Sequence, residues 1–319
     1  MFSRALMALL PVLPMTAAAA EPSFPTRPVR LIVPLAPGGG MDITARGVAL
    51  KMNDVLGQNM VVDNRPDGGG SIGAELTRGA PPDGYTLLMA SATLLTHKLL
   101  SAALYDPVRD FAAVSQVSGQ PYVLVINPAV PARTTAEFIA HAKANPGKLN
   151  FSSSGTGSLI HLTGELFNSK AGVKLVHIPY KGIAASYPDL FSGQIQLTFA
   201  SIISATPHVK NGKLRALGVT SRARAKSMPE LPTFAESGVT GFDVSNWYGI
   251  VAPAGTPRAV IERVASATAA VLAQPEVIAR MAGDGSEPIG STPADFTALI
   301  KTDYARWSAV IKQAGIKGE

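Results

Sequence analysis

The chain has 319 residues, of which 46% are hydrophobic and 16% are charged. This composition indicates a globular protein with a sizeable core, and the length favours two domains. The formal net charge of +6 is scattered along the chain and aromatic residues make up only 6%, so we expect no nucleic-acid partner. The absence of cysteine argues against disulfides, thiolate chemistry and a lipoprotein anchor.

The first twenty residues have the pattern of an export signal. Arg4 supplies a positive charge, residues 5–15 are mostly apolar, and residues 18–20 are three alanines that form a small-residue cleavage site. The apolar run contains two prolines and is shorter than the ~20 residues that span a bilayer. We therefore expect cleavage after Ala20 and a mature protein in the periplasm.

The residues after this signal alternate between strand and helix patterns. Residues 29–35 are a short apolar run rich in Val and Ile, which predicts a buried strand. Glycines at 38–40 interrupt the run, and Asp42 stands where the N-cap of a helix over residues 43–56 is expected. Further strands are predicted over 60–64 and 85–90, and further helices over 72–78 and 93–102.

A second series of strands and helices begins at Tyr122. Its strands are predicted over 149–152, 175–178, 194–200 and 214–219, and its helices over 135–144, 159–169, 184–191 and 204–210. After a linker at 231–241, the chain continues with a strand over 246–251 and helices over 259–273, 276–282 and 294–313. This alternation predicts an α/β fold with two lobes, each a mostly parallel sheet flanked by helices.

The loop of Gly38, Gly39 and Gly40 joins a predicted strand to a helix start. Such a turn exposes backbone N–H groups at the positive end of a helix dipole, where anions bind. A second turn, residues 68–73, fits Gly-x-Gly-x-x-Gly, but the following strand ends at Ser91 without the acidic residue that a dinucleotide fold requires. We therefore expect an anion site and no cofactor.

Residues 151–158, with the sequence Phe-Ser-Ser-Ser-Gly-Thr-Gly-Ser, form the corresponding loop of the second series. Hydroxyls and glycines ahead of a helix make a donor-rich concavity suited to an anion or carboxylate, and the lysine of a P-loop is absent. Since ligands of α/β sheets bind beyond the carboxyl ends of the strands, we expect this loop to face the glycine loop.

His161 lies early in the helix after this loop, with Glu165 four residues later. With Ser153 or Ser154 it invites a hydrolase interpretation, but the Gly-x-Ser-x-Gly elbow is absent. We favour a role in which His161 bonds the loop backbone and holds its shape. The remaining histidines lack metal-ligand spacing, so no metal is expected. Tyr180 follows another predicted strand and offers a ring face and a hydroxyl.

Several motifs in fixed order make the chain similar to a known family. They are Ala-Pro-Gly-Gly-Gly-Met-Asp at 36–42, Asn-Arg-Pro-Asp-Gly-Gly-Gly-Ser-Ile-Gly-Ala at 64–74, Ala-Pro-Pro-Asp-Gly-Tyr-Thr-Leu-Leu at 80–88, Ser-Gly-Thr-Gly-Ser at 154–158, Pro-Tyr-Lys-Gly at 179–182 and Trp-Tyr-Gly-Ile-Val-Ala-Pro at 247–253. With these, the chain resembles the Bug-type (TctC-like) periplasmic solute-binding proteins of tripartite tricarboxylate transporters over essentially its whole mature length.

The resemblance implies a type II periplasmic binding protein, a Venus flytrap that holds a small organic acid between its lobes. It implies that the ligand is a mono- or dicarboxylate, with aromatic acids among the candidates. It also implies that the ligand is delivered to large and small integral-membrane transporter subunits. We expect a monomer in which residues 21–123 and 246–319 form lobe 1 and residues 124–245 form lobe 2.

The predicted site binds a ligand and contains no catalytic residue and no metal. It combines the two loops that the resemblance assigns to the carboxylate with the strand-end and loop residues singled out above. Its members are Ala36, Pro37, Gly38, Gly39, Met41, Asp42, Ser91, Ser153, Ser154, Gly155, Thr156, Gly157, His161, Tyr180 and Ser201.

Met41 departs from the family pattern, in which Thr commonly follows the glycine triplet. If its side chain faces the cleft, the more apolar wall suits an aromatic or longer aliphatic acid; if it points into the lobe, nothing follows. Two alternative functions stay open at this stage. One is a secreted hydrolase that uses Ser153 or Ser154 with His161, and the other is a sensor that presents its ligand to a signalling partner.

Overall fold

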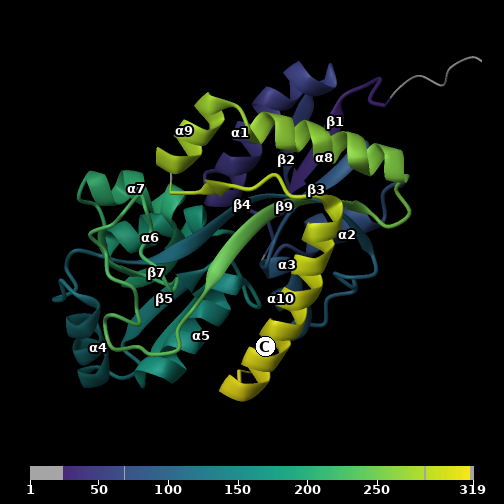
Figure 1. Ribbon diagram of the computed structural model, residues 1–319. Helices are drawn as coiled ribbons and strands as arrows, with labels where there is room; N and C mark the ends of the chain where they lie inside the picture. Colours follow the sequence, from purple (N-terminus) through teal and green to yellow (C-terminus); the bar gives the residue numbers. More distant parts are fainter. Residues whose placement is uncertain (1–23, 68, 284, 317–319) are drawn as a thin grey trace, which may run out of the picture.

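The computed structural model describes residues 24–67, 69–283 and 285–316. It is a two-lobed α/β protein whose strands run in the order β2-β1-β3-β9-β4-β7-β5-β6, with β8 and β10 paired to β4. Figure 1 shows the two lobes side by side, with β4 and β9 passing between them. No helix in the described part of the chain is long and apolar enough to cross a membrane.

The first sheet begins with three parallel strands whose buried residues are mostly Val, Ile, Leu and Met. Each is followed by a helix, as the alternating pattern predicts. The elements are β1 (Val29–Val33), α1 (Gly40–Leu56), β2 (Met60–Asn64), α2 (Ser71–Arg78), β3 (Thr86–Ser91) and α3 (Thr93–Leu100). Helix α1 begins three residues before the predicted start, because the last glycine of the triplet is itself helical.

The second sheet has the same strand–helix alternation. Strand β5 pairs in parallel with both β6 and β7, whereas β4 runs antiparallel to β7 and β8. The elements are α4 (Thr135–Ala144), β5 (Leu149–Ser153), α5 (Leu159–Ala171), β6 (Leu175–Pro179), the 3-10 helix η1 (Ile183–Ser186), α6 (Tyr187–Ser192), β7 (Leu197–Ser201), α7 (Ile202–Lys210) and β8 (Arg215–Val219).

One long strand, β4, is shared by the two sheets, and β9 runs beside its first half. Strand β4 (Phe111–Ile126) pairs through residues 111–121 with β9 (Ser245–Pro253) and through residues 122–126 with β7 and β8. The sequence predicted only the second half of β4, because Ser115, Ser118 and Pro121 interrupt the apolar pattern of its first half. Strand β9 lies antiparallel to β3 and β4, so the first sheet is more mixed than predicted.

The C-terminal segment returns to the first sheet. Its elements are α8 (Arg258–Leu272), α9 (Pro275–Gly283), β10 (Glu287–Pro288) and α10 (Pro293–Ala314). Helix α8 packs on α1 and β4, and α10 packs on β4 and α3. Trp247 of β9 fixes α10, because its indole Nε1 donates to Asp303 Oδ2 at 2.8 Å and its ring meets Phe296 edge-on.

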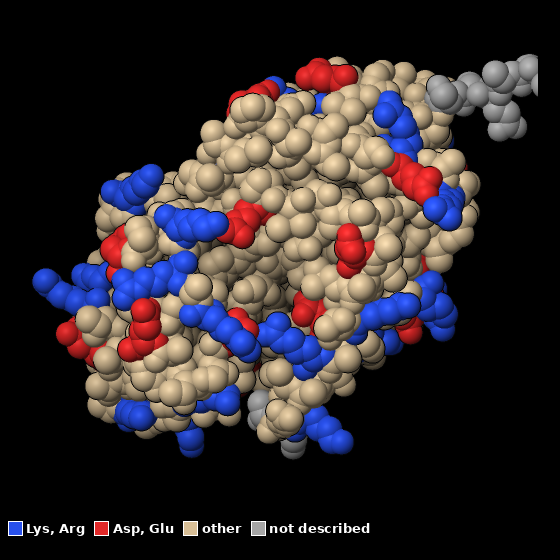
Figure 2. All heavy atoms as spheres, viewed as in Figure 1, with Lys and Arg blue, Asp and Glu red and all other residues tan. Residues whose placement is uncertain are grey.

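The surface charges are intermixed. Lys and Arg side chains lie among Asp and Glu on the face shown in Figure 2. In the densest basic run, Arg222, Arg224 and Lys226 pair with Asp243 at 2.8 Å, Glu236 at 3.0 Å and Glu287 at 2.9 Å. This run is therefore balanced by carboxylates instead of forming a basic stripe.

Candidate ligand-binding site

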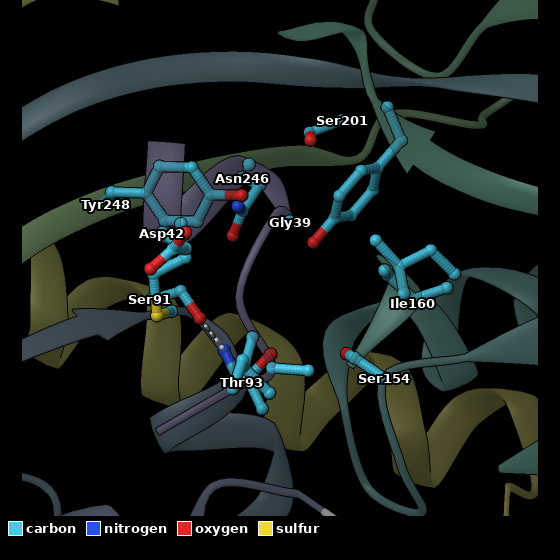
Figure 3. Close-up of a pocket in the computed structure, with 15 residues that line it drawn as sticks. Gly39, Asp42, Ser91, Thr93, Ser154, Ile160, Ser201, Asn246 and Tyr248 are labelled. Carbon is cyan, nitrogen blue, oxygen red and sulfur yellow. Dashed lines mark hydrogen bonds between the residues drawn. The ribbon is translucent and has the colours of Figure 1, made fainter. Parts of the chain in front are cut away.

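A small pocket lies where the carboxyl ends of β1, β3, β5 and β7 approach each other (Figure 3). This is the position at which α/β sheets bind ligands. Its free volume is about 30 Å³. It is lined by Leu35, Ala36, Gly39, Gly40, Met41, Asp42, Ser91, Thr93, Tyr122, Ser154, Ile160, Ile183, Ser201, Asn246 and Tyr248.

The pocket contains about half of the predicted site. Seven predicted residues line it, namely Ala36, Gly39, Met41, Asp42, Ser91, Ser154 and Ser201. The other eight, Pro37, Gly38, Ser153, Gly155, Thr156, Gly157, His161 and Tyr180, are not among its lining residues. The Tyr180 hydroxyl donates instead to Asp189 Oδ2 at 2.5 Å. Burial, and to a lesser extent this hydrogen bond, raise the pKa of Tyr180 to about 12.

The start of α1 forms one wall. Gly39, not Asp42, is the N-cap residue, so the predicted N-cap is wrong. Asp42 lies in the first turn, where its carboxylate accepts N–H bonds from Gly38 at 3.0 Å, Arg46 at 3.0 Å and Asn64 at 2.9 Å. Burial alone raises the pKa of Asp42, but these bonds outweigh it and hold the pKa below its ordinary value. Asp42 therefore shapes the glycine turn as an ionised group.

Gly40 brings this wall against the second sheet. A Cβ at position 40 would lie 2.2 Å from Ser201 Oγ and 2.9 Å from Tyr248 Oη. Any side chain there must push these groups away. A backbone hydrogen bond also joins the two sides, since Ala36 N donates to Lys181 O at 3.0 Å. The glycine loop is thus closed on the opposite lobe.

The loop between β5 and α5 is largely occupied by its own contacts. Ser153 Oγ lies 2.6 Å from His177 Nε2 and accepts from Gly155 N at 3.1 Å. His161 Nδ1 accepts from Gly157 N at 3.2 Å, which confirms the prediction that this histidine bonds the loop backbone. Ser154 is the residue of the loop that reaches the pocket, followed by Ile160 in α5.

Helix α3 of the first sheet holds this loop from outside. Thr93 Oγ1 accepts from Leu159 N at 3.2 Å, and Thr96 Oγ1 donates to Gly157 O at 2.8 Å. His97 Nδ1 lies 3.0 Å from Thr156 O; since a carbonyl only accepts, Nδ1 carries the proton here. We call these three side chains the α3 contacts, and they join the lobes beside the pocket.

The far wall of the pocket comes from β4, β7 and β9. Tyr248 bonds to Ser201, which bonds to Ser204 at 2.9 Å, and Tyr187 donates to Ser204 at 3.0 Å. Burial raises the pKa of Tyr248 and outweighs the bond from Ser201, so the phenol stays neutral. Three of the lining residues were not predicted from the sequence, namely Tyr122, Asn246 and Tyr248. Residues 246 and 248 share one face of a buried strand, and polar groups on such a face are the signal that could have revealed them.

The charges and dipoles around the pocket favour the binding of one anionic group. None of the residues that line the pocket is Lys, Arg or His, and its one carboxylate, Asp42, is already paired. The N-termini of α1 and α5 open on it from opposite sheets, at Gly40 and Ile160. The first-turn N–H groups of a helix carry the positive end of its dipole. In α5, Leu159 N is already bonded to Thr93 Oγ1 at 3.2 Å and His161 N to Ser158 Oγ at 3.1 Å, so this helix acts on the pocket mainly through its dipole. The described residues contain no cluster of His, Asp and Glu that could hold a metal.

A family model described as "Tripartite tricarboxylate transporter family receptor" matches residues 44–316. The chain belongs to this receptor family. Receptors of known structure share its fold closely. The periplasmic binding protein BugD is 34% identical, with 93% of this chain and 100% of BugD aligned at a TM-score of 0.90.

Two further relatives were solved with ligands. An R. palustris protein with adipate is 34% identical over 93% of this chain and 100% of its own, with a TM-score of 0.90. MatC from Rhodopseudomonas palustris, with bound malate, is 29% identical over 90% of this chain and 100% of its own, with a TM-score of 0.86. The family and these neighbours are binding proteins, and BugD is named as periplasmic. The predicted signal, residues 1–20, lies outside the described residues.

Proposed function

We propose that this receptor captures a small organic carboxylate between its lobes in the periplasm and delivers it to the membrane subunits of a tripartite tricarboxylate-type transporter. The main support is one pocket onto which two helix N-termini open from opposite sheets, among hydroxyls and without a basic side chain. Fixed dipoles and hydroxyls of this kind stabilise a carboxylate. The adipate and malate of the two relatives belong to the same chemical class.

We assign lobe 1 to residues 21–123 and 246–319 and lobe 2 to residues 124–245. The change of strand partners supports this division, because β4 pairs with β9 up to Pro121 and with β7 from Tyr122 onwards. The two crossings of the chain, within β4 and at the start of β9, then act as the hinge. A ligand that contacts both lobes favours the closed state, in which the glycine loop and the α3 contacts meet lobe 2.

A binding role accounts for the serine and histidine residues better than hydrolysis does. Ser153 bonds to His177 and does not line the pocket. The Nδ1 atom of His161 accepts the Gly157 N–H, so this nitrogen is engaged with the backbone.

Thermal melting against a panel of mono-, di- and tricarboxylates, aliphatic and aromatic, tests the proposal. At about a hundred times the dissociation constant, a ligand adds roughly 2.7 kcal/mol to the free energy of unfolding. We expect at least one carboxylate to raise Tm by several degrees, while neutral sugars and amines leave it unchanged. A sugar or an amine that raises Tm when no carboxylate does would overturn the proposal.

Uptake measurements separate transport from sensing. Cells that lack the membrane subunits should lose uptake of the ligand, while the purified receptor still binds it. Unchanged uptake in those cells, with a ligand-dependent transcriptional response that needs the receptor, would favour the sensor role.

A further inference from the structure

A groove of about 560 Å³ lies where helices α5 and α10 pack against each other (Figure 1), and we call it the α5–α10 groove. Its walls come from both lobes. Leu166 and Lys170 of α5 lie on one side, and Arg306 and Val310 of α10 lie on the other. The segment that leads into β9 contributes Asp243. These lining residues are separate from those of the ligand pocket.

The charges that line the α5–α10 groove are mostly positive. Lys170, Arg222 and Arg306 are accompanied by one carboxylate, that of Asp243. This carboxylate is shared, because its Oδ2 lies 2.8 Å from Arg222 Nε and 3.8 Å from Arg306 Nη2. In the lower half of Figure 2, Lys and Arg side chains lie on both sides of the gap between the lobes. The groove therefore has a surplus of positive charge.

Lys170 is a cation that the protein leaves without a partner. Its side chain is exposed, and its Nζ lies 3.5 Å from the place where a Cβ at Gly241 would stand. In the part of the chain that the structure describes, no carboxylate or carbonyl pairs with this ammonium. An acceptor that enters the groove therefore meets an uncompensated charge at its wall.

The indole of Trp307 supplies a second unused donor. The residue is 1% exposed and lines the groove, yet its Nε1 has no hydrogen-bond partner. An indole N–H can only donate. Among the described lining residues, no other buried polar side-chain atom is unpaired, so no misplaced acceptor of the lining accounts for this one. An orphaned donor in a groove wall points to an acceptor that arrives with a partner.

The unused groups of the groove are donors, so the complementary partner is rich in acceptors. A carboxylate suits both a lysine ammonium and an indole N–H. Leu166, Val310 and the ring of Trp307 add apolar surface to the lining, and Trp and Arg are the residues that contribute most at protein interfaces. The cations line a concavity between helices instead of a flat face, which fits a protruding peptide segment better than the surface of a bilayer.

We propose that the α5–α10 groove docks an acidic peptide segment of a membrane subunit, with Lys170 and the Trp307 indole as contacts. The inference rests on the proposed function, because it presumes delivery to a membrane partner. A segment that contacts α5 and α10 together stabilises the arrangement seen here, in which the glycine loop is closed on the opposite lobe. Docking and carboxylate binding should therefore strengthen each other, and by the same factor.

A labelled peptide tests the groove by fluorescence anisotropy on the mature protein. The probe is acetyl-Glu-Glu-Leu-Glu-Glu-Leu-amide, and its neutral counterpart has Gln in place of each Glu. We expect the acidic peptide to bind about 10-fold more tightly at low salt and to lose this advantage at high salt, because salt screens exposed charges. The carboxylate that raises Tm most in the melting panel should tighten binding of the acidic peptide by about fivefold or more.

Two variants test the assigned contacts. Lys170→Glu should weaken binding of the acidic peptide by about 10-fold, while carboxylate affinity without peptide is unchanged. The matched control is Lys148→Glu, at an exposed lysine outside the groove, and it should keep the peptide affinity. Trp307→Phe keeps an aromatic ring and removes the donor, so we expect about 3- to 10-fold weaker peptide binding. A packing role alone would lower Tm and leave the peptide affinity unchanged.

Uptake in cells tests whether the partner is the membrane subunit. Cells in which Lys170→Glu replaces the wild-type receptor should take up the carboxylate more slowly, although the purified variant binds it normally. Cells with Lys148→Glu should take it up at the wild-type rate.

Four results would overturn the inference while the proposed function stands. They are equal binding of the acidic and neutral peptides, equal losses of peptide affinity in Lys170→Glu and Lys148→Glu, wild-type uptake with Lys170→Glu, and Lys170-dependent binding to phosphatidylglycerol vesicles without binding of the peptide. The last result would mean that the groove contacts a lipid surface. Failure of every carboxylate to raise Tm would instead overturn the proposed function, and peptide binding to the ligand-free protein would still decide what the groove binds.

Discussion

The two loops that face the pocket look alike in sequence and behave differently in the structure. The glycine loop brings Gly39, Gly40 and the first turn of α1 directly to the pocket. The Ser/Gly loop, residues 153–158, uses most of its polar groups on itself and on helix α3, and only Ser154 of this loop lines the pocket. A hydroxyl-rich loop can therefore bind a ligand only through those donors that are not already used in hydrogen bonds within the protein.

Gly40→Ala should have the largest effect, because the new Cβ meets Ser201 Oγ at 2.2 Å when the lobes are closed. We expect about a 100-fold loss of ligand affinity, as overpacking by a methyl group destabilises a packed contact by roughly 1–3 kcal/mol. Titration calorimetry measures it. The apo fold should be kept, because alanine suits a helix better than glycine.

Gly283→Ala is the matched control, since a Cβ at this helical position has open space. It should leave the affinity unchanged. Wild-type affinity in Gly40→Ala would show that the glycine loop does not close against Ser201 when ligand binds.

Asp42→Asn tests whether a carboxylate shapes the glycine loop. We expect a loss of roughly 1–3 kcal/mol in the free energy of unfolding at pH 7, because charge-assisted bonds from Arg46 and Gly38 N are weakened. The folded pKa of Asp42 is lowered, so the unfolded state binds the proton more readily. The stabilisation is therefore present above the unfolded pKa of about 4 and is lost as pH falls through the folded pKa.

Urea unfolding at a series of pH values measures the difference in free energy of unfolding between wild type and Asp42→Asn. This difference should be constant above about pH 5 and should shrink below about pH 4. A gap that widens on acidification would contradict the assignment of Asp42 as an ionised structural group.

Ser153→Ala and Ser154→Ala separate the structural from the ligand-facing part of the Ser/Gly loop. Ser153→Ala removes the bonds to His177 and Gly155 N, so it should lower the free energy of unfolding by about 1–2 kcal/mol with little change in affinity. Ser154→Ala should lower affinity by about 3- to 10-fold with little change in stability. Melting curves measure the stability of both variants, and calorimetry measures their affinity. A loss of affinity in Ser153→Ala together with a loss of stability in Ser154→Ala would reverse the roles assigned to the two serines.

Thr96→Val has the smallest expected effect. It removes one α3 contact, the bond to Gly157 O, without changing the volume of the side chain. We expect affinity to fall by about 2- to 10-fold, since one neutral hydrogen bond between the lobes is lost. Thr297→Val also removes a hydroxyl that donates to a carbonyl, but within α10, and should leave affinity unchanged. Equal effects of the two variants would mean that the α3 contact does not favour closure.

The sequence predicted the strand–helix alternation and the glycine loop well, because both depend on local patterns. The extent of β4 was missed, since its first half is polar in places and is a strand only because β9 pairs with it. The pocket was predicted only in part, because some of its residues also depend on long-range strand pairing. Ser91 and Ser201 follow from strand ends, whereas Tyr122, Asn246 and Tyr248 reach the pocket through pairing of segments far apart in the chain.

The position of β9 has a consequence for how the protein folds. This strand lies between β3 and β4 in the first sheet, although more than a hundred residues separate it from either in the chain. The N-terminal segment therefore cannot complete its sheet until residues 245–253 have been synthesised. Long-range pairing of this kind is slow to form. A nascent chain that lacks its last third remains without this central strand, so β3 and the first half of β4 lack their shared neighbour until the C-terminal segment emerges.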